Sequence, residues 1–155
     1  MERKIVGFHL DDRRDWVAEL DCFHGQHVRH KPPFINRPWV ESDMGRAEQL
    51  GAILNCVRCD EFEMPEDLIP YKQTPHFDEN SVPTGLLKEH STKVGVWGSI
   101  EVVSGALLYS TQKRTVTLSP GVVGIIPPQL VHSVAPEQSV IFYVQFYSKQ
   151  AEESV

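Results

Sequence analysis

Two short pairs of soft metal ligands constrain the first 60 residues of this 155-residue chain. Cys22 and His24 form a C-x-H pair, and Cys56 and Cys59 form a C-x2-C pair. Two thiolates in a C-x2-C can both reach one zinc ion, and a second pair from a distant segment completes a tetrahedral set. A unit of this size buries little apolar surface and usually needs a metal or a similar staple. The spacing therefore predicts a structural zinc site.

The fourth ligand stays open at this point, because His27 or His30 could replace His24. Two other interpretations compete with a zinc site. In the first, the C-x2-C binds nothing and the histidines are surface residues. In the second, the C-x2-C is a redox motif, although no βαβ pattern surrounds it. The chain has three cysteines, an odd number, and no evident export signal. This count disfavours a disulfide framework and favours metal thiolates.

The pattern around these ligands predicts a small zinc-ribbon-like module over residues 1–62. The stretches KIVGFHL and DWVAELD alternate or run apolar over strand length on either side of the charged turn DDRRD, which predicts a β-hairpin. Ser42 or Asp43 can cap a short helix that Gly51 ends, just before the C-x2-C.

Residues 66–150 follow a different pattern and predict a cupin-like antiparallel β-barrel or sandwich. Cysteine is absent after Met64, and short apolar runs alternate with Gly, Pro, Ser and Asn. The runs are rich in β-branched and aromatic residues, which is typical of strands in sandwiches and barrels. The whole chain is therefore expected to be mainly β.

Composition excludes several classes of function. The hydrophobic share of 41% is enough for a packed core. The net charge of −6 gives no general footprint for nucleic acid, although residues 29–31 are locally cationic. No apolar run approaches the roughly 20 residues of a membrane span. The opening MERKIVGFHLDDRRDW turns acidic where a signal peptide would be apolar, so we expect a cytoplasmic protein.

His90 and His132 are candidate ligands for a second metal, because each lies beside turn residues in the β-rich half. Strand alternation places Glu101 on one face with Trp97, and if that face looks inward, Glu101 completes a two-histidine, one-carboxylate set. Such a set suits non-haem iron or another divalent ion. The interpretation favoured here is simpler: Glu101 is a solvated strand residue and the histidines are hydrogen-bonded groups at the barrel mouth.

Two resemblances add to these patterns. The segments KIVGFHLDDRRDWVAELDCFHGQHVRHKPPF, RPWV and GRAEQLGAILNCVRCD resemble a small bacterial family of uncharacterised domains with a C-x-H-x2-H-x2-H-x-P-P stretch and a terminal C-x2-C. This resemblance covers about residues 1–60 and brings no established activity.

Residues 68–148 are similar to the cupin-like domain that precedes the methyltransferase in the tellurite-resistance protein B family. The segments LIPYKQTPHFDENSVPTGLLKEHSTKVGVWGSIEVVSGALLYS, GIIPPQLVHSV and VIFYVQFYS carry this resemblance. Gly121-x5-Pro127-x4-His132 resembles the second cupin motif, whereas the first motif is degenerate. No strand, glycine loop and helix for a nucleotide-type cofactor follows, so methylation of tellurite is not expected.

The predicted ligand pocket is walled by Trp97, Tyr109, Tyr143 and Gln145, and the amide of Gln145 stands where an acidic residue would offer a metal oxygen. No catalytic residue is assigned. The resemblances imply a bacterial stress or oxyanion-resistance protein that binds a metal or small ligand in its barrel. The alternative is a metal-dependent cupin enzyme acting on a small molecule. A protein partner or a homodimer, paired through an edge strand, would fit the first hypothesis.

Overall fold

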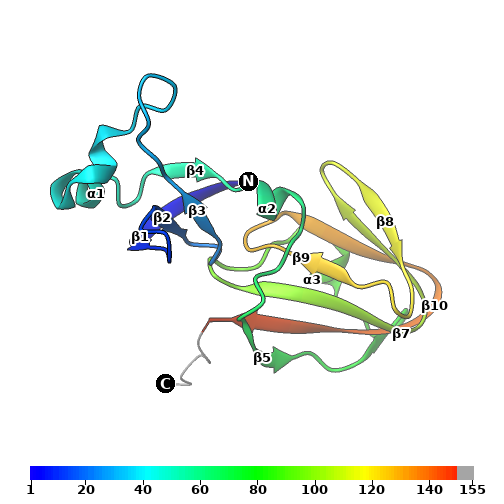
Figure 1. The fold of residues 1–155 in the computed structure, drawn as a ribbon. Helices are drawn as coiled ribbons and strands as arrows, with labels where there is room; N and C mark the ends of the chain where they lie inside the picture. The colour runs from blue at the N-terminus through cyan, green and yellow to red at the C-terminus, as the bar shows by residue number, and fades with distance from the viewer. Residues whose placement is uncertain (150–155) are drawn as a thin grey trace. The chain divides into compact units, whose positions relative to one another are not determined.

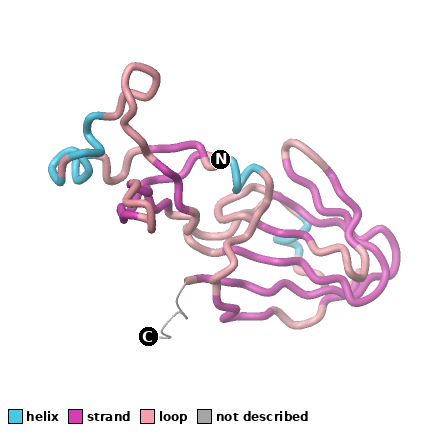
Figure 2. The backbone as a smooth tube through the Cα atoms, in the orientation of Figure 1, coloured by secondary structure: helices cyan, strands magenta, loops and turns pink. Residues whose placement is uncertain are grey.

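The computed structural model describes residues 1–149 and divides the chain into two compact units, Met1–Glu61 and the residues from Phe62 on (Figure 1). Strands make up most of the second unit, whereas the first unit combines strands, loops and short helices (Figure 2). The chain is thus mainly β with antiparallel sheets, which confirms the predicted fold class. None of the helices in these residues is long and apolar enough to cross a membrane.

The first unit is built on a four-stranded antiparallel sheet in the order β3-β2-β1-β4. Strands β1 (Glu2–Leu10) and β2 (Trp16–Leu20) form the predicted hairpin, and the pairing runs from Ile5 opposite Leu20 to Leu10 opposite Trp16. The Asp11 carboxylate accepts backbone N–H bonds from Arg13 and Asp15 and so closes the turn between them. Strands β3 (Gly25–His27) and β4 (Ile53–Asn55) flank this hairpin.

Three short helices connect β3 to the end of the first unit. They are η1 (Pro38–Glu41), α1 (Asp43–Glu48) and α2 (Val57–Asp60). Of the two predicted caps, the Ser42 hydroxyl is the one that accepts the Gly45 N–H at 3.0 Å and begins α1. Gly51 has φ 86° and lies in the turn that leads from α1 into β4.

The second unit contains a six-stranded antiparallel sheet around two long strands, β7 (Trp97–Thr111) and β10 (His132–Ser148). Strand β5 (Ile69–Gln73) and the short β6 (Phe77–Asp78) pair with β10, whereas β8 (Thr115–Leu118) and β9 (Gly124–Ile126) pair with β7. The helix α3 (Thr84–Leu87) is a single turn.

The core of the second unit lies between facing segments of these strands. Ile100 and Val102 of β7 belong to it, yet so do Leu107 and Tyr109, which have the opposite parity. The change occurs because the register of β7 against β10 shifts between residues 102 and 107. Gly105, with φ 79°, lies in this irregular stretch. The inward face of β7 is therefore even-numbered before the shift and odd-numbered after it.

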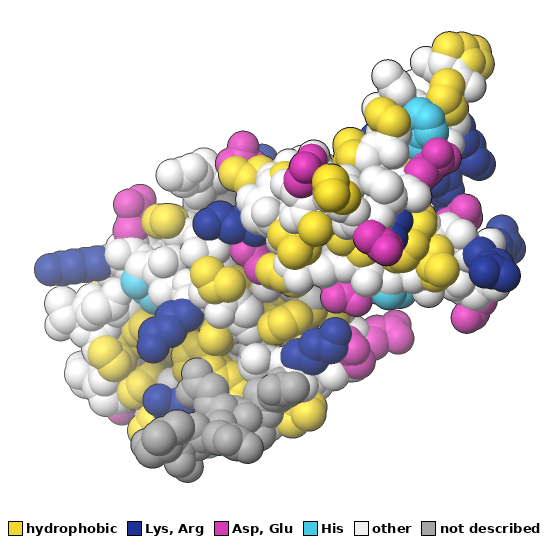
Figure 3. All heavy atoms as spheres, turned by 90° about the vertical axis from the view of Figure 1, so that its left-hand side faces the viewer, with side chains coloured by type: hydrophobic (Ala, Val, Ile, Leu, Met, Phe, Trp, Pro, Cys, Tyr) yellow, Lys and Arg dark blue, Asp and Glu magenta, His cyan; other side chains and the backbone are white. Residues whose placement is uncertain are grey.

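The surface view in Figure 3 shows acidic and basic side chains interspersed over one face. Apolar and uncharged side chains lie between them.

Candidate metal site and ligand cavity

The first unit brings Cys22, His24, Cys56 and Cys59 together in a buried cluster. One ligand atom from each residue lies within 4.8 Å of all the others. Cys22 and His24 come from the loop between β2 and β3, Cys56 caps the start of α2, and Cys59 lies inside that helix. A hairpin loop and a helix start thus present one ligand pair each, and together they could hold a metal ion.

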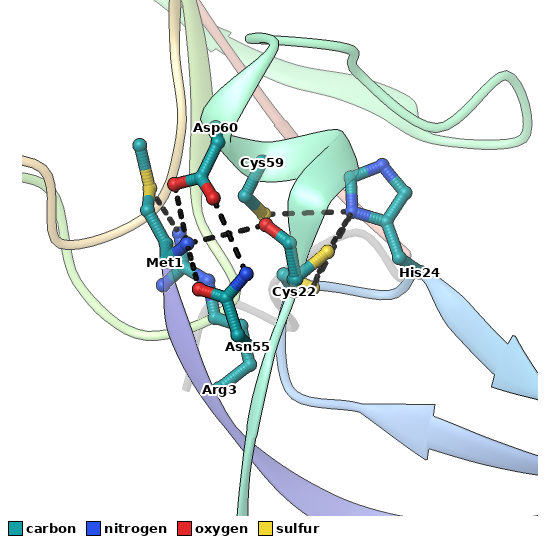
Figure 4. A network of polar contacts seen from close by, with 8 residues as sticks. Met1, Arg3, Cys22, His24, Asn55, Cys59 and Asp60 are labelled. Atoms are coloured by element: carbon teal, nitrogen blue, oxygen red, sulfur yellow. Dashed lines mark hydrogen bonds and ion pairs between the residues drawn. The ribbon is translucent and has the colours of Figure 1, made fainter. Parts of the chain in front are cut away.

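The distances within this cluster are those of a tetrahedral site. The Cys22 and Cys56 sulfurs lie 3.8 Å apart, and His24 Nδ1 lies 3.3 to 3.4 Å from all three sulfurs. A tetrahedron with ordinary zinc bond lengths has sulfur–sulfur edges of about 3.8 Å and sulfur–nitrogen edges of about 3.6 Å. Figure 4 shows the imidazole directed at the sulfurs through Nδ1. The donor set and its spacing fit zinc.

Proton sharing makes this cluster receptive to a cation. Hydrogen bonds from Cys22 and Cys59 hold the pKa of the Cys56 thiol far below its usual range. Hydrogen bonds with Cys56 and Cys59 raise the pKa of Cys22. Burial lowers the pKa of His24, but its bonds with Cys56 and Cys59 outweigh burial and raise that pKa to about 9. A metal cation would displace these shared protons.

His27 and His30, the alternative ligands, have other partners. His27 Nε2 contacts Asp11 Oδ2 at 2.8 Å at the exposed end of β3. The backbone bond from Asp15 and the bond with His27 lower the pKa of Asp11. His30 Nδ1 accepts the Arg37 N–H at 2.9 Å. Neither ring belongs to the group of ligand atoms within 4.8 Å of one another, and the structure assigns the imidazole of the cluster to His24.

Contacts of Met1, the residue before β1, fix the start of α2, where two of the thiols lie. The Cys56 N–H donates to the Met1 carbonyl at 2.7 Å. The Met1 amino group donates to Asn55 Oδ1 at 2.9 Å and pairs with the Asp60 carboxylate, as Figure 4 shows. These contacts hold the start of α2 against the sheet, beside the four ligands.

The second unit contains a cavity of about 270 Å³. Its wall is mainly apolar and includes core side chains of β7, β9 and β10. Its polar groups come from β5, from the loop that precedes β7 and from the start of β10. The lining residues are Tyr71, Lys72, Thr74, Leu86, His90, Ser91, Thr92, Lys93, Val96, Ile100, Ile126, His132, Val134, Phe142, Val144 and Phe146.

His90 and His132 both line this cavity and pack against each other. Their ring centroids are 4.1 Å apart, and the two residues exchange backbone hydrogen bonds of 2.9 Å in both directions. His132 is 2% exposed. Burial lowers its pKa to about 4, and the nearby His90 contributes to this decrease. His132 is therefore a neutral imidazole at pH 7.

Glu101 does not join the two histidines. It lies on the face of β7 opposite to Ile100, which lines the cavity, and Ser99 Oγ lies 3.3 Å from its carboxylate. Alternation along the strand separates Glu101 from the cavity, so the condition of the metal hypothesis, that this face looks inward, is not met. The two-histidine, one-carboxylate set is not assembled.

The predicted pocket wall also needs correction, since none of its four side chains lines the cavity. Trp97 is fully buried, and Tyr109 is packed in the core, where its hydroxyl donates to the Ile125 carbonyl at 2.9 Å. Tyr143 packs against His76, and Gln145 donates to the Lys72 carbonyl at 2.8 Å. Strand parity places Trp97, Tyr143 and Gln145 on the other face of the sheet.

Sequence reasoning missed the polar groups that do line the cavity, chiefly Thr92, Lys72 and Lys93. The Thr92 hydroxyl donates to the Val96 carbonyl at 2.8 Å and accepts the Gln129 N–H at 3.2 Å, which fixes the loop before β7. Gly95, with φ 71°, lies in a turn closed by the Val96 N–H and the Lys93 carbonyl. The dense stretch from His90 to Gly98 was a usable signal, because its turn residues shape this wall.

Comparison with known proteins assigns both units. Residues 6–63 match the family model described as "Protein of unknown function (DUF3565)", and residues 72–144 match the model described as "TehB-like domain". The chain joins a DUF3565 domain to a TehB-like domain, and both sequence resemblances are confirmed.

The relatives share only part of their length with this chain. Over 46 residues it is 39% identical to the "Probable S-adenosyl-L-methionine-dependent methyltransferase TehB" of Haemophilus influenzae. The matched segment covers 30% of this chain and 16% of that protein. The crystal structure of TehB from Haemophilus influenzae superposes with a TM-score of 0.50 and 28% identity, over 54% of this chain and 32% of that one.

A protein from Escherichia coli strain K12 is similar to this chain in its fold only. Its crystal structure has a TM-score of 0.50 and 22% identity, over 57% of this chain and 96% of its own.

Proposed function

We propose that this chain is a cytoplasmic bacterial protein that binds a small ligand in the cavity of its second unit and carries a structural zinc ion in its first. The observation that carries the proposal is the apolar cavity of about 270 Å³ with a buried, neutral His132 in its wall. Concave, mostly apolar sites with a few convergent polar groups are the usual form of small-molecule sites. The sequence resemblance to the tellurite-resistance protein B family supports a role in a stress or oxyanion response, such as resistance to tellurite.

The zinc ion supplies folding energy to the first unit in this proposal. Four protein ligands close the coordination sphere, and closed tetrahedral sites are structural. The surface that this unit forms when folded would then bind a protein partner. In the same proposal, the chain also binds a second copy of itself by pairing through an edge strand such as β8.

Ligand binding is tested by nuclear magnetic resonance titration of the zinc-loaded chain with small organic probes that differ in charge. We expect backbone amide signals of Thr92 and Val134, which line the cavity, to shift, whereas those of Lys113 in the exposed β7–β8 turn stay in place. A titration in which no probe moves the cavity signals would contradict the proposal.

A metal-dependent enzyme is the second candidate, and one observation favours it. Nδ1 of each cavity histidine is engaged by a carbonyl, so that Nε2 could bind a metal. The described lining residues include no carboxylate, however, and two imidazoles are a small set for a catalytic ion. Elemental analysis of protein made without a histidine tag decides between the candidates. A second metal that His132→Ala removes would place the enzyme first, and about one zinc per chain with no other metal would favour the binding protein.

A further inference from the structure

The proton position on His132 follows from its hydrogen bond. Its Nδ1 lies 2.7 Å from the Leu130 carbonyl oxygen. A carbonyl can only accept, so Nδ1 carries the proton and donates it. In a neutral ring Nε2 is then an acceptor. Nε2 has no hydrogen-bond partner among residues 1–149, although the side chain is almost fully buried against the cavity.

His90 repeats this arrangement next to His132. Its Nδ1 donates to the Lys88 carbonyl at 2.9 Å, which leaves Nε2 as the free position of the ring. The backbone bonds between the two residues hold their backbones together, and the Nδ1 bonds orient the two rings. An imidazole acceptor at the wall can accept a hydrogen bond from a bound molecule, so the cavity is suited to an occupant that donates a hydrogen bond here.

The rest of the wall restricts the occupant further. Another part of the wall is apolar and includes Phe142 and Val144. Lys72 and Lys93 also line the cavity, and both have exposed side chains. Lys72 is paired with Phe146 across β5 and β10, and cross-strand partners share a face, which agrees with the place of both residues in the cavity wall. None of the described lining residues is acidic.

We infer that the cavity selects a small organic anion with an apolar body and a hydroxyl group. The hydroxyl donates to Nε2 of His132, the body lies against Phe142 and Val144, and the anionic end pairs with Lys93 or Lys72 at the exposed side. A donor in the form of an ammonium is disfavoured, because two lysines already line the site and no carboxylate balances another cation. This inference rests on the proposed function and names the chemical class of its ligand.

The test compares four probes that share an aromatic body. They are 4-hydroxybenzoate, benzoate, 4-hydroxybenzyl alcohol and tyramine. We expect 4-hydroxybenzoate to bind about three- to tenfold more tightly than benzoate or 4-hydroxybenzyl alcohol, because each of these lacks one of the two polar interactions. Lys72→Met and Lys93→Met together should remove the advantage conferred by the carboxylate and keep that of the hydroxyl, while Lys113→Met, outside the cavity, should change neither.

A second measurement needs no substitution at a buried residue. In protein labelled with ¹⁵N in its histidines, 4-hydroxybenzoate should shift the Nε2 resonance of His132 in the direction of an accepted hydrogen bond. The resonances of His76, which is exposed and lies outside the cavity, should not move. Benzoate should leave Nε2 of His132 unchanged.

The outcomes separate this inference from the proposed function. Equal affinity for benzoate and 4-hydroxybenzoate, or a preference for tyramine, would overturn the ligand class while cavity signals still show that small molecules bind. Displacement of the probes by zinc or iron, with loss of the effect in His132→Gln, would overturn it in favour of a metal at the two imidazoles. If none of the probes shifts the cavity signals, both the ligand class and the proposed function are overturned.

Discussion

Phe23 separates the two ligands of the first pair and has a left-handed backbone with φ 73°. A bulky residue rarely adopts this conformation, because its Cβ then approaches the carbonyl oxygen. Strained residues of this kind persist where the surrounding structure compensates for them. Here the reversal turns the β2–β3 loop so that the Cys22 sulfur lies 3.4 Å from His24 Nδ1. A single backbone conformation therefore makes the C-x-H pair a chelating pair.

The buried His132 makes the stability of the second unit dependent on pH. Its pKa is about 4 in the folded chain and 6.5 when exposed, so the unfolded chain binds the proton first as the pH falls. We expect the free energy of unfolding to decrease between pH 6.5 and pH 4, by up to about 3 kcal/mol from this group alone. Chemical denaturation at several pH values, followed through methyl resonances of the second unit, measures the decrease.

His132→Gln is the control for this prediction, because the amide does not titrate. Asp78 also contributes to the pH dependence, because backbone hydrogen bonds from Asn80 and Ser81 lower its pKa and are weakened when it is protonated in acid. The His132→Gln variant retains this contribution of Asp78 and loses only that of His132. The variant should show a clearly smaller pH slope than the natural chain. Equal slopes would mean that His132 is not the titrating group.

Among the elements, the irregular stretch of β7 decides which side chains reach the core. Gly105 lies opposite Val140 of β10, and a Cβ added to it would come within 1.9 Å of the Ser139 carbonyl oxygen. The φ of 79° adds a conformational penalty for any other residue. Gly105 thus permits both the close approach of β10 and the change in strand parity.

Gly105→Ala is expected to destabilise the second unit by more than about 2 kcal/mol, because backbone atoms have to move apart. Gly121→Ala is the matched comparison. Gly121 has φ 86° with open space around its Cα, so alanine there incurs only the conformational penalty of about 1–2 kcal/mol. Thermal or chemical unfolding of the two variants measures the difference, and equal destabilisation would argue against a steric role of Gly105.

The same stretch shows where sequence reasoning ends. Local spacing was sufficient to pair Cys22 with His24 and Cys56 with Cys59, since both pairs lie within three positions. Alternation correctly separated Glu101 from Ile100, but it does not say which face is covered, so the sequence left open whether Glu101 looks inward. Tyr109 has the parity of Trp97 yet lies in the core, because the register shift between them has no distinctive residue pattern.

At the scale of the whole molecule, the chain consists of two units with separate sheets and separate chemistry. Cys59→Ser is expected to release zinc and unfold residues 1–61 while the second unit stays folded, because structural metal binding and folding are coupled. Metal analysis together with a two-dimensional amide spectrum measures both effects. His27→Ala, which removes an imidazole outside the cluster, should retain the metal, and unchanged zinc content in Cys59→Ser would rule out the proposed site.

All four donor groups of the cluster belong to the first 59 residues. Chains are synthesised from the N-terminus, and domains generally fold as units in that order. The ligand set is therefore complete as soon as Cys59 has left the ribosome, before β7 and β10 have been translated. The supply of metal during synthesis, and not only in the finished protein, would then determine whether the first unit is folded by the time the second one emerges.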